Sequence, residues 1–126
     1  MTELPSFQLG SPRTELRRTL VDAVLAGEKT ATAGLWSDYE AEGEELDTPG
    51  ALYALRGYDD EPVAIVEVTE ARRVPASEID VDFARDEGEG FESVDDWRVA
   101  HETFFGQPIA PETEIVAVRF RLVERL

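Results

Sequence analysis

The last long segment of the chain, residues 114–124, alternates apolar and charged side chains with a period of two. Every second residue from Val116 to Leu122 is apolar, and Arg119 and Arg121 stand between them. Successive side chains of a strand point to opposite faces, so the pattern predicts a strand with one buried face. Because its backbone groups need partners, such a strand requires a sheet built from the rest of the chain.

Three other segments are candidates for the neighbouring strands. Residues 62–74 and 51–57 are rich in β-branched and other apolar residues, and they flank the turn-like sequence YDDE. Residues 29–32 are short and rich in threonine, and we expect Gly34 to break that strand. The sheet is therefore expected to contain at least four strands.

The first helix is expected between Ser11 and Gly27. Ser11 is a suitable N-cap, Pro12 suits the first helical position, and Gly27 follows the predicted end. Apolar residues recur there at helical spacing, and the arginines of the segment lie mostly off this stripe. The stripe consists of Leu16, Leu20, Val21, Val24 and Leu25.

Further helices are expected at 36–42, around 79–87, and from Ser93 to about Phe105, where Ser93 is the N-cap. The predicted order is helix, strand, short helix, two strands, two helices and a final strand. This order predicts an α+β fold, in which helices lie across the openings of a small mixed sheet or barrel.

Composition limits the kinds of partner. Acidic residues outnumber basic ones by 28 to 12, which gives a net charge of −16. Because nonspecific nucleic-acid binding depends on Lys and Arg contacts to phosphate, this charge argues against a long RNA or DNA groove. A local basic pocket is still compatible with it. The absence of cysteine excludes disulfides, thiolate nucleophiles and Cys-ligated zinc.

The chain also lacks the sequence signs of a membrane or secreted protein. No apolar run approaches the ~20 residues of a membrane helix, and no secretory signal is recognisable. We therefore expect a cytoplasmic protein that makes no membrane contact.

Lys29 is the only lysine of the chain, beside eleven arginines. An amine can lose its proton, whereas a guanidinium in a protein cannot. Thr32 follows three residues later, and a hydroxyl beside a neutral amine can act as an activated nucleophile. In an extended segment the two side chains point to opposite sides unless the backbone bends. The alternative interpretation is an exposed Lys–Thr turn.

Glu87 and Glu67 are two carboxylates on faces that also carry apolar residues. Glu87 continues the four-residue spacing of Ile79 and Phe83, so a half-buried carboxylate suited to acid/base chemistry is one interpretation. Glu67 shares a strand face with Ile65. The alternatives are a solvent-facing helix-end glutamate and an ion-paired strand residue.

The aromatic residues and the single histidine suggest a binding pocket or a core. His101 lies on one helical face with Trp97 and Phe104, which favours a packed histidine over a catalytic one. Trp36 and Tyr39 lie close in a short helix and could form an aromatic wall that stacks a base.

The acidic run at 80–90 does not form a calcium loop, because no glycine stands at the sixth position after Asp80 and Asp82. Two or three of its carboxylates could still bind a divalent ion. With one histidine and no cysteine, a zinc site is not expected.

Several of these segments together resemble the ASCH-domain family, whose fold is similar to the PUA RNA-binding barrel. The family motif G-x-K-x-x-T is present as Gly27, Lys29 and Thr32. The segment FARDEGEGFESVDDWRVAHETFF resembles a bacterial subfamily with EGEG followed by WR, H and FF, and the strand VEVTEARRV also matches. The resemblance extends from Phe7 to the final strand, so residues 1–126 are expected to form a single ASCH domain.

The resemblance implies an activity. ASCH proteins include a small bacterial amidohydrolase that removes the acetyl group from N4-acetylcytidine, and its Thr–Lys–Glu triad falls on Thr32, Lys29 and Glu87. Other relatives have been proposed as RNA-binding modules or as metal-dependent ribonucleases. The family motif often continues T-x-R, but this chain has Gly34 there, and Phe91 stands where the subfamily is expected to have Asp.

We therefore predict a small hydrolase of an N4-acylated cytidine nucleoside or a short RNA, without a cofactor, as monomer or homodimer. Lys29, Thr32 and Glu87 are the predicted catalytic residues. The predicted substrate-binding residues are Trp36, Tyr39, Glu67, Arg98, which could replace the missing motif arginine, and His101. The alternatives are a non-enzymatic RNA- or nucleotide-binding module and a ribonuclease that needs a divalent metal at Asp86, Glu87 and Glu89.

Overall fold

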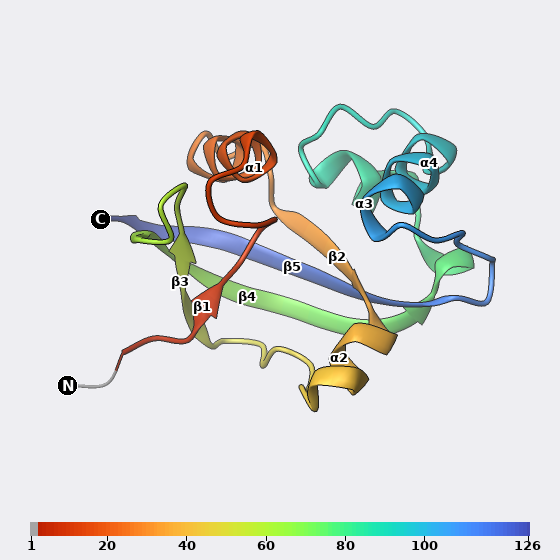
Figure 1. Cartoon of the computed structure of the whole chain (residues 1–126), viewed down its shortest axis with the longest axis horizontal. Helices are drawn as coiled ribbons and strands as arrows, with labels where there is room; N and C mark the ends of the chain where they lie inside the picture. The colour runs from red at the N-terminus through yellow and green to blue at the C-terminus, as the bar shows by residue number, and fades with distance from the viewer. Residues whose placement is uncertain (1–2) are drawn as a thin grey trace.

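A mixed five-stranded sheet organises the chain in the computed structural model, which describes residues 3–126 (Figure 1). The strand order is β1-β3-β4-β5-β2, with β1 parallel to β3 and all other neighbours antiparallel. The strands are β1 (Ser6–Phe7), β2 (Ala31–Leu35), β3 (Leu52–Arg56), β4 (Pro62–Pro75) and β5 (Glu114–Arg125). The helices are α1 (Glu15–Leu25), α2 (Trp36–Glu42), α3 (Val81–Asp86) and α4 (Val94–Phe105), with a 3₁₀ turn at Ala76–Glu78.

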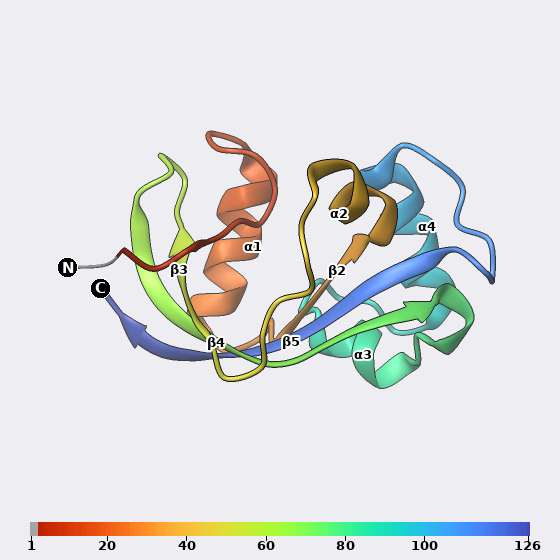
Figure 2. The same cartoon turned by 90° about the horizontal axis from the view of Figure 1, so that it is seen from below.

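The long antiparallel pair β4–β5 runs through the whole molecule, as Figure 2 shows. Its register shifts twice, between Ile65 and Val66 and between Val68 and Glu70. Such irregularities bend and twist a strand pair. The curved pair carries α1 near one end and α3 with α4 near the other (Figure 1).

Two apolar clusters form the core, and β5 contributes to both. Alternate residues Val116, Val118 and Phe120 belong to the cluster under α1, which also contains Leu20, Val24 and Leu55. Ile115 and Ala117 belong to the cluster around α3 and α4. The first part of β5, residues 115–118, is therefore buried on both faces, whereas from Arg119 to Arg121 only the predicted apolar face is buried.

The predicted α+β architecture and most elements are confirmed. The short helix α2 has the predicted bounds, and α4 begins after Ser93, whose hydroxyl accepts a hydrogen bond from the Asp96 N–H. The two-residue strand β1 was not predicted, because two residues cannot carry a periodic pattern. No helix within residues 3–126 has the length and apolar character needed to cross a membrane.

Two local predictions are wrong. Thr14, not Ser11, caps α1, and Arg13 adopts a left-handed φ of 58° just before it. The Arg13 N–H is bonded to the Tyr58 carbonyl, so tertiary contact decides where the helix begins. Gly34 does not break β2, because its pairing with β5 continues through Gly34 to Leu35.

Arg17 is fully buried, at 0% exposure, although it belongs to the arginines that the helical pattern places mostly off the apolar stripe. Its guanidinium donates to the chain before α1 and to the turn between β3 and β4. The acceptors are the carbonyls of Leu9, Gly10 and Gly57 and the side chains of Gln8 and Asp60. The Arg17 side chain therefore connects two loops to α1 through hydrogen bonds.

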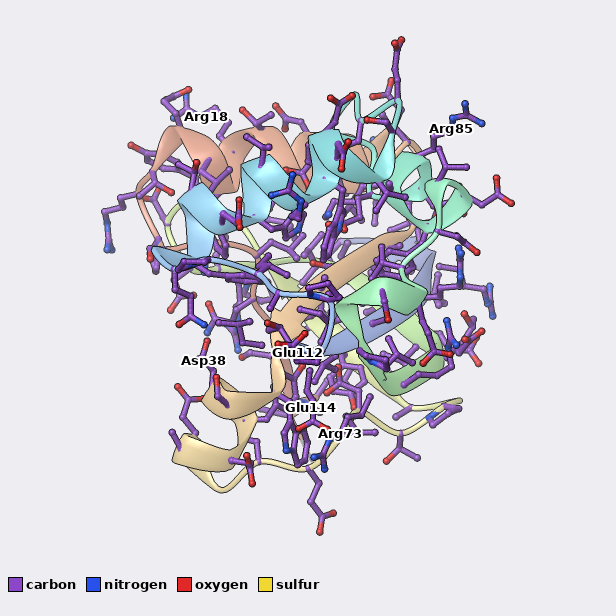
Figure 3. All side chains as sticks on the ribbon, turned by 90° about the vertical axis from the view of Figure 1, so that its right-hand side faces the viewer. Arg18, Asp38, Arg73, Arg85, Glu112 and Glu114 are labelled. Atoms are coloured by element: carbon purple, nitrogen blue, oxygen red, sulfur yellow. The ribbon has the colours of Figure 1, made fainter. Side chains whose placement is uncertain are left out.

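We expect Arg17→Ala to lower the free energy of unfolding by about 3 kcal/mol, because it leaves buried acceptors without donors. The matched control is Arg18→Ala. The Arg18 side chain is 51% exposed on the outside of α1 (Figure 3), so its loss is expected to cost less than about 1 kcal/mol. Urea denaturation of both variants measures the difference. Equal destabilisation by the two substitutions would contradict this role.

Candidate active site

A cavity of about 380 Å³ lies between α1, β2, α4 and the loop after α3. The polar side chains that line it include Lys29, Thr32, Glu87, Glu89 and His101. Its remaining lining is mainly apolar, and Leu16 and Phe104 are also exposed at the surface, at 40% and 55%. The cavity thus joins a buried polar end to an apolar, solvent-exposed rim.

Lys29 reaches the cavity because the chain turns sharply after α1. Gly27 adopts a φ of 79°, and the N–H groups of Glu28 and Lys29 both bond to the Ala23 carbonyl. Lys29 is only 2% exposed. Its Nζ donates to the Glu87 carbonyl at 3.1 Å and to Glu89 Oε2 at 3.4 Å, and it lies 3.7 Å from Glu87 Oε1.

Gly88 allows the loop after α3 to lie directly on the Lys29 segment. Its φ is 70°, and a Cβ there would lie 2.5 Å from the Glu28 carbonyl oxygen and 2.8 Å from Lys29 Cα. No L-amino acid with a side chain fits such an approach without displacement. The Thr30 N–H bonds to the Asp86 carbonyl and closes the same contact. Glu87 and Glu89 are thereby held on either side of Gly88, next to Lys29.

Glu87 ends α3 and is 1% exposed, so the carboxylate is more deeply buried than the predicted half-buried position. The Trp97 indole N–H donates to its Oε2. His101 Nε2 lies 3.2 Å from its Oε1. Oε2 therefore faces the Trp97 N–H and Oε1 faces a ring nitrogen of His101, and both of these residues belong to α4.

His101 is held on several sides. Its Nδ1 lies 2.8 Å from the Trp97 carbonyl oxygen, and its ring stacks on the Trp97 indole at 4.4 Å between centroids. Phe91 and Phe105 pack against the ring as well. Burial opposes charging of the ring, but the hydrogen bond and the charge of Glu87 outweigh it and raise the pKa of His101 above 6.5.

Thr32 lies in β2, opposite Val118 of β5, and is half-buried. Lys29 precedes the strand, which begins at Ala31. The two residues line one cavity despite their spacing, because only Thr32 belongs to the regular extended segment.

A second cavity, of about 460 Å³, adjoins the first at Gln8, Thr32 and Ala33, which line both. Tyr39 and Gly34 line it together with three carboxylates. These are Glu42, Glu44 and Asp47. Burial and the nearby negative charges raise the pKa of Tyr39, and burial raises that of Asp47.

Three of the predicted binding residues line neither cavity. The Trp36 ring stacks on the Tyr39 ring, with 6.2 Å between ring centroids. The Arg73 guanidinium lies over the Trp36 ring, 4.5 Å from its centroid. Arg73 is in turn paired with Glu114, as Figure 3 shows. The Trp36 side chain therefore contributes to the scaffold beneath Tyr39.

Glu67 and Arg98 are engaged in local pairs outside the cavities. Glu67 accepts a hydrogen bond from Arg121 of the neighbouring strand at 2.7 Å. Arg98 pairs with Glu102 one helical turn away and lines neither of the two cavities. Of the five predicted binding residues, Tyr39 and His101 line one of these two cavities.

The acidic side chains of residues 86–89, named as a possible metal site of a ribonuclease, are each held by other groups. Asp86 pairs with Arg119 at 2.6 Å, Glu87 is held by α4, and Glu89 faces Lys29. Within residues 3–126, no three His, Asp or Glu side chains converge in an arrangement that could hold a metal ion.

The family is shown by comparison with known proteins. The model of the ASCH domain matches residues 6–124, so the chain belongs to the ASCH-domain family, as the motifs imply. A search of curated proteins found no match.

Solved structures show the same fold. An ASCH domain from Lactobacillus crispatus JV V101 is 28% identical, with a TM-score of 0.78 over 94% of this chain and 80% of the other. Protein EF3133 from Enterococcus faecalis V583 is 24% identical, with a TM-score of 0.80 over 96% of this chain and 77% of the other. The hypothetical protein PH0355 is 16% identical, with a TM-score of 0.59 over 86% of this chain and 94% of the other. These likenesses confirm the predicted fold class.

Replacing Gly88 tests whether the close contact places the carboxylates. Gly88→Ala combines a left-handed φ with a backbone clash, whereas Gly90 has a φ of 86° and no atom within 4 Å of an added Cβ. We expect Gly90→Ala to lower the free energy of unfolding by about 1 kcal/mol, and Gly88→Ala to lower it by roughly 2 kcal/mol more. Chemical denaturation provides the measurement. Equal losses would mean that the contact does not restrain the loop.

Proposed function

We propose that this ASCH domain is an amidohydrolase of small acylated nucleosides, with N4-acylated cytidine as the model substrate and Thr32 as the nucleophile. The observation that carries the proposal is one cavity lined by Thr32 and by the buried pair of Lys29 and Glu87. Acyl transfer through a hydroxyl nucleophile needs a group that can take its proton, and the Lys29–Glu87 pair is a candidate for that group in the same cavity.

The size and charge of the cavity support a small substrate. About 380 Å³ lies within the range of small-molecule sites. The net charge of −16 repels a long polyphosphate, whereas an uncharged nucleoside is unaffected. The apolar rim favours an uncharged ligand in addition.

The proposed reaction has two steps. Thr32 Oγ1 attacks the amide carbonyl and gives up its proton to the Lys29–Glu87 pair. The pair delivers a proton to the leaving nitrogen as the C–N bond breaks, which leaves an ester on Thr32 and a free amine. Water then attacks the ester, and a proton returns to Oγ1, so that a carboxylic acid is released and the residues are restored.

A nucleoside-binding module is the second candidate. It is favoured by the contacts of the Lys29 amine, whose hydrogens are directed at the Glu87 carbonyl and Glu89. An amine that only donates would orient a ligand without accepting a proton. In that case the cavity would bind cytidine derivatives and leave them unchanged.

Incubation with N4-acetylcytidine, followed by chromatography of released cytidine, tests the proposal. We expect Thr32→Ala and Lys29→Arg to lower kcat/KM at least about 100-fold, and Thr32→Ser to retain part of the activity. Thr30→Ala is the matched control, because the Thr30 hydroxyl donates to the Asp86 carbonyl and Thr30 does not line the cavity.

Circular dichroism and thermal unfolding establish that each variant is folded. No cytidine release by the wild-type protein, with measurable binding of N4-acetylcytidine, would instead support the binding module. Full activity of Thr32→Ala would exclude Thr32 as the nucleophile.

The apolar rim gives a separate prediction about substrate binding. Phe104 and Val99 lie on α4 with nearly equal exposure, 55% and 56%, but only Phe104 lines the cavity. We expect Phe104→Asp to raise KM about tenfold by placing a charge beside the substrate, and Val99→Asp to leave it unchanged. Steady-state kinetics of the two variants measure the effect. A similar KM in both would show that the substrate does not contact the rim.

A further inference from the structure

His101 is the only histidine of the chain, and both of its ring nitrogens face oxygen atoms. Nδ1 lies 2.8 Å from the Trp97 carbonyl oxygen, and Nε2 lies 3.2 Å from Glu87 Oε1. The side chain is 8% exposed, so water does not compete freely for either contact.

If both ring contacts of His101 are hydrogen bonds, the His101–Glu87 pair holds one proton between them. A carbonyl oxygen only accepts, so Nδ1 carries the hydrogen of a neutral imidazole. The Nε2 lone pair of that neutral ring would then face an ionised carboxylate oxygen, which is repulsive. A favourable contact needs one further proton, either on Nε2 or on Oε1.

The surroundings of Glu87 fit a pair that holds one proton. The Trp97 N–H donates to Oε2, and Lys29 Nζ lies 3.7 Å from Oε1. Glu89 faces Lys29 from the other side at 3.4 Å. The charges of Lys29 and Glu89 balance each other, and Glu87 with His101 and one proton is also neutral. A neutral set of groups is the least costly to bury.

We propose that Glu87 and His101 share one proton, and that His101 is a positioning residue that keeps Glu87 ready to pass a proton to the leaving group. The shared proton goes to the leaving nitrogen, and the proton of Thr32 replaces it, so the pair is restored. The catalytic part of this inference rests on the proposed amidohydrolase function. The sharing of the proton does not.

The pH dependence follows from the groups that face the ring, which are Glu87, Glu89 and Lys29. Glu87 raises the pKa of His101 above 6.5, against the effect of burial. A raised pKa means that the pair stabilises the fold fully below about 6.5 and loses this contribution as pH rises through the raised value. Activity is expected to fall over the same alkaline range, with an apparent pKa that belongs to the pair.

Nuclear magnetic resonance can follow this pair without ambiguity, because the protein contains a single imidazole. We expect the ¹⁵N shifts of wild-type His101 to report two protonated nitrogens at pH 6 and an apparent pKa above about 6.5. In Glu87→Gln burial is the largest remaining influence on the ring, ahead of the smaller raising effects of the Trp97 carbonyl and Glu89, so the pKa of His101 is expected to fall below about 6.5. Glu89→Gln is the matched control, and we expect it to change the pKa of His101 less than Glu87→Gln does.

A wild-type imidazole that titrates at or below about 6.5 would overturn the proposal, and this measurement needs no substitution. An unchanged pKa in folded Glu87→Gln would overturn it as well. Both readouts are independent of turnover, so they separate this inference from a failure of the proposed function.

Kinetics then test the positioning role. His101→Gln keeps a donor near the position of Nε2 but cannot titrate. We expect its pH–rate profile to lose the alkaline limb of the wild-type profile while part of kcat remains. A purely structural histidine would instead lower activity equally at all pH values, and that outcome would exclude the positioning role.

Discussion

The buried charge of Lys29 is the constraint on which the arrangement of the site depends. An ammonium group taken out of water is strongly unfavourable unless oxygen atoms surround it. Those oxygens come from Glu87 and Glu89, so the loop after α3 must lie on the chain that follows α1. Gly88 is what makes the approach sterically allowed. The same loop position directs the Glu87 carboxylate toward α4. One charge therefore links the end of α1 to α3 and α4, although Lys29 and Glu87 lie 58 residues apart in the chain.

The sequence predicts those parts of the fold that depend on local pattern. Alternation identifies β4 and β5, and a serine followed by an apolar stripe identifies α4. Arg17 could not be predicted to be buried, because its acceptors include Gly57, forty residues away in the chain. The start of α1 depends on the same kind of tertiary contact, since the Tyr58 carbonyl holds Arg13 outside the helix.

The candidate site was predictable to a similar extent. Glu87 prolongs an apolar stripe, and it is indeed buried at the end of α3. Glu67 and Arg98 have the chemistry of binding residues, but a partner strand and an i,i+4 neighbour satisfy them. Helical spacing places His101 on the buried face of α4. Spacing alone cannot show that the ring is both packed and bonded to Glu87, because Glu87 belongs to another helix.

Gly34 occupies the position at which the family motif often has arginine, and the structure shows what fills that space here. A Cβ on Gly34 would lie 3.3 Å from the Tyr39 ring, so the ring must shift before any side chain fits. Both residues line the second cavity, whose three carboxylates take part in no ion pair within the described part of the chain. Any residue with a Cβ at position 34, arginine included, therefore requires the Tyr39 ring to shift by a few tenths of an ångström.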